Sequence, residues 1–349
     1  MKVALALLAV GVVVAVFFRA AILTPVAFRP VDLSGKTIVM AGGTSGIGLE
    51  AARRFASWNA TVVIGSRSRA KGERVSADLL STLPPESTGS VNMLDLDLAS
   101  FASVKEFATT VRAAYKNIDV LALNAGMHGK EHVVLTRDGN EETYQTNFLS
   151  HYLLTSLLLP VLRSTPGARI VHTSSAMHYL GSLDHSVHDA HTRNADSATA
   201  RCGIKSYCDT KLMNVVYSNW LDRTEPDVSS VATHPGLVST DLDRNQPALV
   251  AAAMRAIRRA TSRPASDGAV TLVTAATLED PAWARGSRNG RGVYLEDQCI
   301  MNECVERCSL CYHVEADPGG GMRPHAISDD VEEQEWLVQQ AKEIVAEFL

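Results

Sequence analysis

Residues 36–48, with the sequence KTIVMAGGTSGIG, decide the fold. The segment begins as a buried strand and ends in a turn of glycines, and a helical pattern follows from Glu50 to Trp58. Glycines in such a turn let the backbone approach a pyrophosphate closely, and the unpaired N–H groups at the start of a helix attract that anion. A strand, a glycine turn and a helix in this order predict a dinucleotide-binding site.

On both sides of this segment, apolar strand patterns alternate with helical patterns. Further strands are expected at 60–64, 90–96, 120–123, 169–173 and 229–233. One further helix is expected after Arg67, ending at about residue 83, and others at 103–115, 141–162, 207–221 and 332–348. Strands that are apolar on both faces indicate a parallel sheet covered by helices on both sides. The predicted fold class is α/β, a Rossmann-type doubly wound parallel sheet flanked by helices, in a single domain from 34 to 349.

The composition excludes several classes of protein. Of the 349 residues, 46% are hydrophobic and 20% are charged, which is too apolar for a disordered chain. With 33 basic against 38 acidic side chains, the chain has no general electrostatic affinity for nucleic acid, and we expect no nucleic-acid partner. The six cysteines all lie after residue 200, so the fold is not a small disulfide scaffold.

The N-terminal segment is predicted to be a transmembrane helix. Residues 3–18 carry no charged or polar side chain, and residues 20–23 are apolar again. A helix over residues 3–23, at ~1.5 Å per residue, covers the roughly 30 Å hydrocarbon core of a bilayer. We therefore predict a membrane anchor at residues 1–24 and a linker at residues 25–33. A cleaved signal peptide and a buried or interfacial helix are the alternatives.

The charges beside this segment predict its orientation. Lys2 alone precedes it, whereas Arg19, Arg29 and Lys36 follow it. Positive charge stays on the cytosolic side of a membrane. The folded domain is therefore expected to face the cytosol.

Four short motifs appear in the order and at the spacing of a known family. They are the glycine motif at 41–48, Asn124-Ala-Gly126, Tyr207-x-x-x-Lys211 and His234-Pro-Gly236. With them the chain, from about residue 34 to its C-terminus, resembles the short-chain dehydrogenase/reductases. The sequence around the last two motifs is most similar to that of the branch of the retinol dehydrogenases and WW-domain oxidoreductases. An N-terminal membrane anchor is common in that branch, and we expect a single-pass protein of the endoplasmic reticulum.

The resemblance implies a catalytic set of Asn147, Ser175, Tyr207 and Lys211. Tyr207 and Lys211 lie about one turn apart on one face of a helix. A nearby ammonium stabilises a phenolate and lowers the pKa of the phenol, so Tyr207 is expected to exchange a proton with a carbonyl or alcohol oxygen. Ser175, or its neighbour Ser174, is expected to polarise that oxygen, and Asn147 to hold a water that links Lys211 to solvent.

Arg67 predicts the kind of nicotinamide cofactor. In a Rossmann unit an acidic residue at the end of the second strand binds the ribose 2′-hydroxyl, whereas an arginine there accommodates a 2′-phosphate. Here the strand runs from Ile64 to Arg67 with no acidic residue in reach. A guanidinium forms paired, charge-assisted bonds with phosphate. We therefore predict NADP(H) rather than NAD(H), with a solvated surface arginine as the alternative.

The other cofactor contacts follow from the motifs and from the resemblance. Asp97, at the end of the third strand, is expected to bond the adenine, with Asp95 as a substitute. Thr240 is expected to bond the carboxamide or phosphate side of the cofactor. The complete expected set is Gly42, Thr44, Ser45, Gly46, Ile47, Gly48, Arg67, Asp97, Asn124, Ala125, Gly126, Tyr207, Lys211, Pro235, Gly236 and Thr240.

Two positions depart from the family pattern. Ala41 stands where a threonine is usual, and Leu123 stands where an asparagine often precedes the Asn-Ala-Gly motif. Loss of the threonine hydroxyl removes a hydrogen bond between turns, at a net cost of about 1 kcal/mol. This departure leaves room for a rival function, a membrane-tethered NADP-binding regulator with weak or no catalysis.

Substrate contacts are expected from residues 181–206 and 241–264. The second segment is rich in Ala, Leu, Val and Met between Pro247 and Ala256 and carries several arginines, as an amphipathic lid does. We therefore predict an NADP-dependent enzyme that acts on a lipophilic carbonyl or alcohol, such as a retinoid, sterol or lipid aldehyde. An NAD-linked alcohol oxidiser is the alternative among enzymes, and a homodimer is expected.

Two clusters resemble metal sites, but we predict no metal. His185, His188 and His191 are spaced by three residues in a polar segment. Four cysteines between Cys299 and Cys311 include a Cys-x-x-Cys, but their spacing is irregular and the resembled family needs no metal. Zinc binding, a disulfide and free thiols all stay open for these cysteines.

Overall fold

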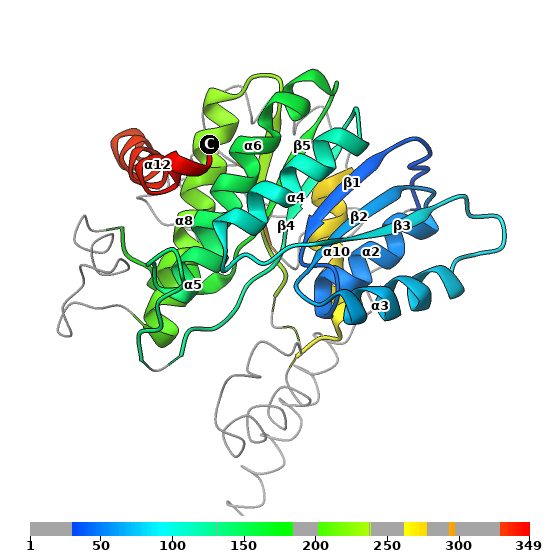
Figure 1. Cartoon of the computed structure of the whole chain (residues 1–349), viewed down its shortest axis with the longest axis horizontal. Helices are drawn as coiled ribbons and strands as arrows, with labels where there is room; N and C mark the ends of the chain where they lie inside the picture. The colour runs from blue at the N-terminus through cyan, green and yellow to red at the C-terminus, as the bar shows by residue number, and fades with distance from the viewer. Residues whose placement is uncertain are drawn as a thin grey trace, which may run out of the picture.

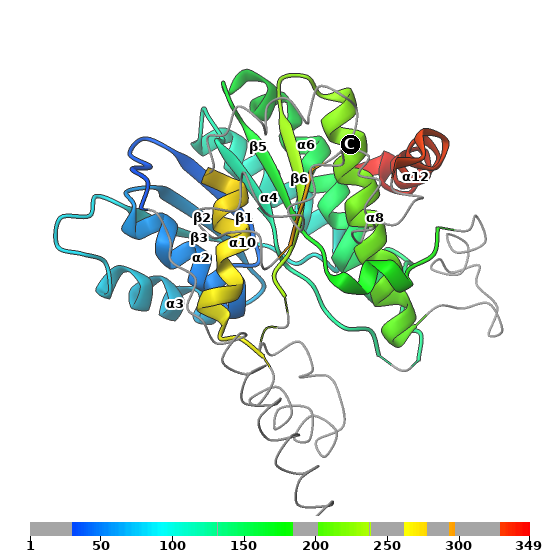
Figure 2. The same ribbon diagram turned by 180° about the vertical axis from the view of Figure 1, so that it is seen from behind.

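The computed structural model describes residues 30–130, 132–183, 202–236, 238, 262–277, 293–296 and 329–349. The centre of this part of the chain is a sheet of seven parallel strands in the order β3-β2-β1-β4-β5-β6-β7, with helices on both faces (Figures 1 and 2). The chain changes direction along the sheet between β3 and β4, so the carboxyl ends of β1 and β4 form a switch point. Ligands of open α/β sheets bind at such a point. The predicted α/β fold is confirmed.

The strands follow the apolar runs of the sequence. They are β1 Thr37–Ala41, β2 Thr61–Ser66, β3 Ser90–Asp95, β4 Val120–Leu123, β5 Arg169–Thr173, β6 Ser229–His234 and β7 Val293–Glu296. The first six match the predicted strands to within a few residues at each end. Sequence analysis did not predict β7, which extends the sheet by pairing with β6.

The helices that cover the sheet end within about four residues of the predicted helix ends. They are α2 Gly46–Ser57, α3 Arg69–Ser81, α4 Phe101–Ala114, α5 Glu142–Tyr144, α6 Ser150–Ser164, α8 Gly203–Thr224, α10 Ala265–Thr277 and α12 Val331–Val345, with the 3₁₀ turns η2 Ala176–Leu180 and η6 Ala346–Phe348. α10 was not predicted.

Each face of the sheet has its own apolar core, because successive strand residues point to opposite faces. Val39 of β1 belongs to the cluster that includes Phe107 of α4 and Leu153 of α6. Its neighbour Met40 belongs to the cluster that includes Phe55 of α2 and Leu272 of α10. Burial of each such side chain stabilises the fold by about 1.5–3 kcal/mol. Residues 37–41 are thus apolar throughout because both of their faces are covered.

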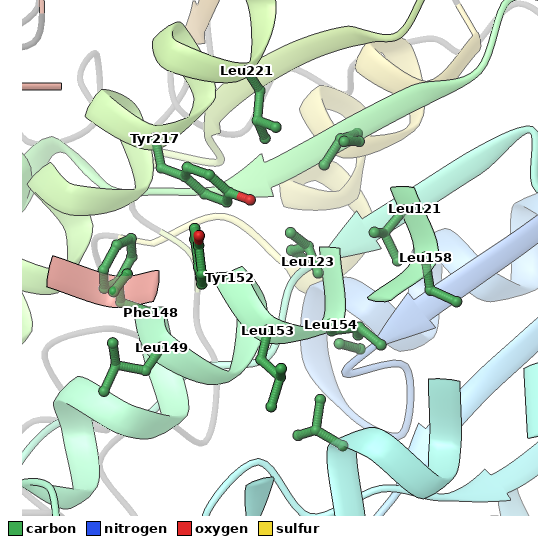
Figure 3. Close-up of a cluster of buried hydrophobic side chains, with 14 of the residues drawn as sticks. Leu121, Leu123, Phe148, Leu149, Tyr152, Leu153, Leu154, Leu158, Tyr217 and Leu221 are labelled. Carbon is green, nitrogen blue, oxygen red and sulfur yellow. The ribbon is translucent and has the colours of Figure 1, made fainter. Parts of the chain in front are cut away.

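Aromatic packing holds α8 against α6. The ring of Tyr217 on α8 lies beside that of Tyr152 on α6, and the two ring centroids are 5.1 Å apart (Figure 3). Phe148 meets the same Tyr217 ring edge-on at 6.1 Å. Because α8 also carries Tyr207 and Lys211, this packing determines where those two side chains lie.

The structure divides a helix that the sequence predicts as continuous over 141–162. After α5, residues Gln145–Leu149 form a π-helical turn, η1, before α6 begins. Asn147 lies in this turn and exchanges two hydrogen bonds with the backbone of Met127. π-turns inside helices occur frequently at functional sites. The apolar pattern is the same on both sides of the turn, so the sequence did not reveal it.

Several predictions concern residues outside the described ranges. These are the anchor at 1–24, residues 25–29 of the linker, residues 184–201 and 241–261 of the expected substrate segments, Thr240, His185, His188, His191 and the cysteines from Cys299 to Cys311. Among the helices that the structure describes, none has the length and apolar character needed to cross a bilayer. Within the same residues, no group of three or more His, Cys, Asp or Glu side chains is arranged to hold a metal ion.

Candidate active site

The glycine turn after β1 has no space for a side chain at two of its positions. Gly42 has a φ of +93°, in the left-handed region, and a Cβ there would lie 2.6 Å from the backbone nitrogen of Ala125. A Cβ on Gly48 would lie 1.9 Å from the carbonyl oxygen of Gly42. α2 therefore starts in direct contact with the turn, which keeps its N-terminus close to any bound phosphate.

Asn124 joins the glycine turn to β5. Its side-chain amide donates to the Gly42 carbonyl oxygen at 2.8 Å, and its oxygen accepts from the Thr173 hydroxyl at 3.1 Å. The backbone nitrogens of Asn124 and Ala125 both donate to the Ala41 carbonyl oxygen. The ends of β1, β4 and β5 are thus connected even though Ala41 has no hydroxyl.

The N-terminus of α2 is suited to an anion. Its N-cap, Ser45, has extended backbone, and its side chain makes no capping hydrogen bond. The first turn of the helix contains no acidic side chain. The positive end of the helix dipole therefore meets no carboxylate within its own first turn. Thr44, Ser45, Gly46, Ile47 and Gly48 all lie in this cradle, and the arrangement fits the pyrophosphate of a dinucleotide.

The expected adenosine contacts lie at the ends of β2 and β3. Arg67 directly follows β2 and is exposed, and no group within the described residues pairs with it. Asp97 is half-buried, and its Oδ1 accepts the backbone N–H of Ala99 at 3.1 Å. Asp95 is the exposed last residue of β3. The paired register of β2 and β3 brings Arg67 and these carboxyl groups to the same edge of the sheet.

Lys211 is a buried ammonium held by the end of β5. Its side chain is 3% exposed, and its Nζ donates to the Thr173 carbonyl oxygen at 2.7 Å. The same Nζ lies 5.5 Å from the centroid of the Tyr207 ring. Burial lowers the pKa of Lys211 to about 8, so the group is mostly charged at neutral pH.

Tyr207 differs from the prediction in its acidity. Burial raises the pKa of Tyr207 to about 12, and a side-chain hydrogen bond with Ser175 acts in the opposite direction. The sequence predicted that Lys211 would lower this pKa. In the structure the Lys211 ammonium donates to Thr173 instead, and desolvation of the phenolate is the larger effect.

The two serines after β5 have different surroundings. Ser174 is buried, and its hydroxyl donates to the Lys211 carbonyl oxygen at 2.7 Å. Ser175 is half-buried, and its Oγ bonds Tyr207 and accepts the backbone N–H of Met177. The Ser174 hydroxyl is therefore already bonded to the backbone of α8, whereas the Ser175 hydroxyl lies beside the Tyr207 hydroxyl.

Asn147 connects three segments of the site. Its Oδ1 accepts the backbone N–H of Met127, and its Nδ2 donates to the Met127 carbonyl oxygen and to the Thr210 hydroxyl. Gly126 lies between Asn147 and Lys211, because a Cβ there would be 3.5 Å from Asn147 Oδ1 and 3.4 Å from Lys211 Nζ. In this structure the Asn147 amide holds segment 126–130. The predicted water contact stays a prediction.

Two further residues belong to the site but were missed by sequence analysis. Glu141 is buried and accepts the N–H groups of Thr143 and Tyr144 and, at 2.6 Å, the hydroxyl of Ser206, the residue before Tyr207. Glutamate is not among the preferred N-cap residues, so no pattern marked it. His128 lies with its ring centroid 4.2 Å from that of Tyr207.

The turn after β6 completes the described part of the site. Pro235 is buried, and Gly236 has a φ of +78°, which reverses the chain at the same sheet edge. The expected site residues therefore lie at or beside the carboxyl edge of the sheet, except Thr240, which lies outside the described ranges.

Comparison with known proteins gives consistent results. The sequence pattern described as short chain dehydrogenase matches residues 36–188. Polyprenol dehydrogenase from Mus musculus is 34% identical over 72% of this chain and 76% of its own length. Retinol dehydrogenase 13 from Homo sapiens is 33% identical over 61% of this chain and 62% of its own length. The WW domain-containing oxidoreductase of Gallus gallus is 32% identical over 71% of this chain and 60% of its own length. The chain spans less than two thirds of the latter two relatives.

Solved structures agree on the fold. An uncharacterized protein from Mycobacterium paratuberculosis superimposes with a TM-score of 0.61 at 24% identity, covering 90% of this chain and 95% of its own. A short chain dehydrogenase from Burkholderia cenocepacia, solved with NADP, gives a TM-score of 0.56 at 22% identity over 76% and 98% of the two chains. At these identities the likeness concerns the backbone arrangement alone.

Proposed function

The chain belongs to the short-chain dehydrogenase/reductase family, in the branch of the retinol dehydrogenases, and from this premise we propose an NADP(H)-dependent oxidoreductase that interconverts a lipophilic carbonyl compound and its alcohol. One observation carries the proposal. Ser175, Tyr207 and Lys211 meet at the end of β5, and Thr173 and Asn124 connect that point to the glycine turn.

The proposed reaction needs one proton and one hydride. A bound nicotinamide would supply the hydride to the carbonyl carbon, or accept it from an alcohol. The Ser175 hydroxyl donates a hydrogen bond to the carbonyl oxygen, and Tyr207 transfers its hydroxyl proton to the same oxygen. The alcohol leaves, and solvent restores the proton on Tyr207. In the oxidation direction Tyr207 takes the proton of the alcohol instead.

Lys211 supports the proton transfer electrostatically. Tyr207 becomes negative when it gives up its proton, and burial makes that charge costly. The Lys211 ammonium lies on the same helix face within 5.5 Å of the ring and lowers this cost. Its bond to the Thr173 carbonyl keeps it from moving into solvent.

Arg67 supports the choice of NADP(H). It is exposed at the end of β2, where the 2′-position of a bound ribose lies in a Rossmann unit. Within the described residues no carboxylate is bonded to it. A phosphate would give the guanidinium its first charged partner in this part of the chain.

The relatives support a lipophilic substrate. The names of two of them refer to polyprenol and retinol, both of which are long apolar alcohols. The apolar N-terminal segment supports the same view, because a membrane anchor at residues 1–24 would bring the site near lipid. We place the protein in the endoplasmic reticulum membrane with its folded domain on the cytosolic side.

Turnover measurements with the full-length chain in lipid vesicles test the proposal. NADPH oxidation is followed with a retinoid aldehyde, a sterol ketone, a long-chain lipid aldehyde and small polar carbonyls. We expect kcat/KM to rise with the apolar area of the substrate. Turnover of polar carbonyls alone, or none with any carbonyl, contradicts the proposed function.

A charge reversal tests the cofactor. Arg67→Asp is expected to weaken NADPH binding by about tenfold to hundredfold, because a charge-assisted bond contributes about 1.5–3 kcal/mol. Binding of NADH should stay the same or improve. Arg112→Asp, at an exposed position on α4, serves as the matched control for net charge. Equal losses for both cofactors would contradict the 2′-phosphate contact.

A further inference from the structure

His128 lies against Tyr207 although it belongs to a different segment of the chain. The two ring centroids are 4.2 Å apart with an interplanar angle of 49°. Rings at this separation are in contact, and such pairs contribute about 0.5–1.5 kcal/mol beyond the area that they bury. His128 is half-buried, so the contact lies at the boundary between the protein interior and the site.

The backbone before His128 is held by Asn147. Both polar backbone groups of Met127 bond the Asn147 side chain, the N–H at 2.9 Å and the carbonyl oxygen at 3.0 Å. Asn147 is fully buried in the π-turn η1. A side-chain amide that binds one residue twice leaves that residue little freedom to turn.

The backbone after His128 is held on a second side. A Cβ on Gly129 would lie 2.8 Å from the backbone nitrogen of Gly203 and 2.9 Å from the Thr143 hydroxyl. Lys130 forms a 2.9 Å ion pair with Glu142. Segment 126–130 is therefore attached to η1, to α5 and to the start of α8, and His128 is its one residue whose ring contacts Tyr207.

We propose that His128 is a positioning residue of the active site, which packs at a tilt against the Tyr207 ring and keeps the hydroxyl of that ring directed at Ser175. The proposal rests on the proposed function, because positioning has meaning only if Tyr207 transfers a proton. It also gives Asn147 a role in this chain, since the Asn147 amide holds the segment that carries His128.

Two contacts then determine the direction of the Tyr207 hydroxyl. Ser175, from the end of β5, bonds the hydroxyl itself, and His128, from the segment after β4, limits rotation and shift of the ring. Among the residues that the structure describes, the other polar groups beside this phenol are Lys211 and Cys208, both on α8. Without the imidazole, the ring would gain both freedom of movement and access to water.

Kinetics of ring variants give the first test. His128→Ala is expected to lower kcat about tenfold to hundredfold, because a small misplacement of a reacting group has an effect of that size. The KM for NADPH should not change. His128→Phe, which keeps a ring in contact with Tyr207, should recover most of the kcat. His132→Ala, at an exposed histidine four residues further, is the matched control and should leave kcat unchanged.

Titration of the phenol gives a second test that needs no substrate. Burial holds the pKa of Tyr207 at about 12 against an ordinary value of 10.0, so admitting water should move it downward. Ultraviolet difference absorption of His128→Ala should show one tyrosine that ionises closer to 10.0 than in the wild type. The additional signal should disappear in the double variant with Tyr207→Phe.

The two tests separate the failure of this inference from that of the function. If the wild type turns over no carbonyl but His128→Ala shifts the phenol titration, the contact is real and the proposed function is wrong. If His128→Ala changes neither kcat nor the titration, the inference is overturned. His128→Asn, which is smaller but still polar, carries the same expectations if the alanine variant does not fold.

Discussion

The two halves of the sheet bury very different side chains. Among the described residues up to 130, Ser66 is the single buried side chain that is polar or charged. Between 140 and 233 the described residues bury twenty-four. The first half holds the glycine cradle, and the second holds Tyr207 and Lys211.

This difference shows two ways of building a binding site. Backbone N–H groups and a helix dipole recognise an anion in the first half, so its interior can stay apolar. Proton transfer requires side chains of particular acidity, such as Tyr207 and Lys211. The second half also buries His151 and His172, and burial lowers the pKa values of both histidines and of Lys211. Buried ionisable groups reduce stability, so the second half, which holds Tyr207 and Lys211, should be the less stable of the two.

Removal of the Tyr207 hydroxyl is the strongest test of the comparison. Tyr207→Phe is expected to lower kcat by about 10³-fold, within the range for a lost general acid, and to change cofactor affinity far less. NADPH oxidation and fluorescence titration of NADPH measure the two quantities. A regulator with vestigial catalysis would show the same turnover in the wild type and in Tyr207→Phe. That outcome would contradict a catalytic role for the second half of the sheet.

Replacement of Lys211 should have opposite effects on activity and stability. Below pH about 8 the folded chain contains a buried ammonium, whereas the unfolded chain keeps this charge in water up to about 10.5. The resulting penalty is largest below pH 8 and fades as the pH rises toward 10.5. Lys211→Met should therefore raise the free energy of unfolding at pH 7, by a burial penalty on the order of 3 kcal/mol less about 1–3 kcal/mol for the Thr173 carbonyl that loses its hydrogen bond, while kcat falls.

Urea unfolding at pH 7 and at pH 10 measures this effect. Lys205→Met, at an exposed position of the same helix, is the control and should change stability little. In the wild type, activity that needs the Lys211 ammonium should decline as the pH rises through about 8. A loss of stability in Lys211→Met at pH 7 would contradict the assigned burial penalty.

A glycine variant probes the cofactor half in isolation. Gly48→Ala places a Cβ against the Gly42 carbonyl oxygen, and relief of such overpacking moves the backbone at a cost of about 1–3 kcal/mol. We expect cofactor affinity to fall about tenfold to hundredfold, with the Tyr207 titration unchanged. Gly72→Ala is the control, because its Cβ would meet a flexible methionine end, Met93 Cε, at 3.2 Å. Equal losses of cofactor affinity in Gly48→Ala and Gly72→Ala would contradict a specific role of the glycine turn in cofactor binding.

The last prediction concerns acid. His172 is fully buried, and burial with the nearby Lys211 charge lowers its pKa to about 3 from an ordinary 6.5. The unfolded chain binds a proton below 6.5 that the folded chain does not, so stability falls as the pH drops from 6.5 toward 3, by roughly 1.4 kcal/mol per pH unit. His172→Phe should flatten this slope, whereas the exposed His132→Phe should not. Urea unfolding at pH 7 and pH 5 compares them.

Much of the fold could be predicted because its signals are local. The apolar runs at 120–123 and 169–173 coincide with β4 and β5, and the glycine motif lies where β1 meets α2. β7 was missed because Val293–Glu296 ends in a glutamate and is not a continuous apolar run like the equally short β4. The π-turn at Gln145–Leu149 was missed because hydrophobic spacing does not distinguish it from ordinary helix.

By itself, the sequence determined the alternation of strands and helices, the phosphate cradle and the positions of Tyr207 and Lys211 on one helix. The tertiary structure decided which serine lies beside the phenol, that the phenol is less acidic than free tyrosine, and that His128 packs against its ring. The physical reason is one of range. Secondary structure and glycine turns depend on neighbouring residues, whereas burial and side-chain contacts depend on segments that only folding brings together.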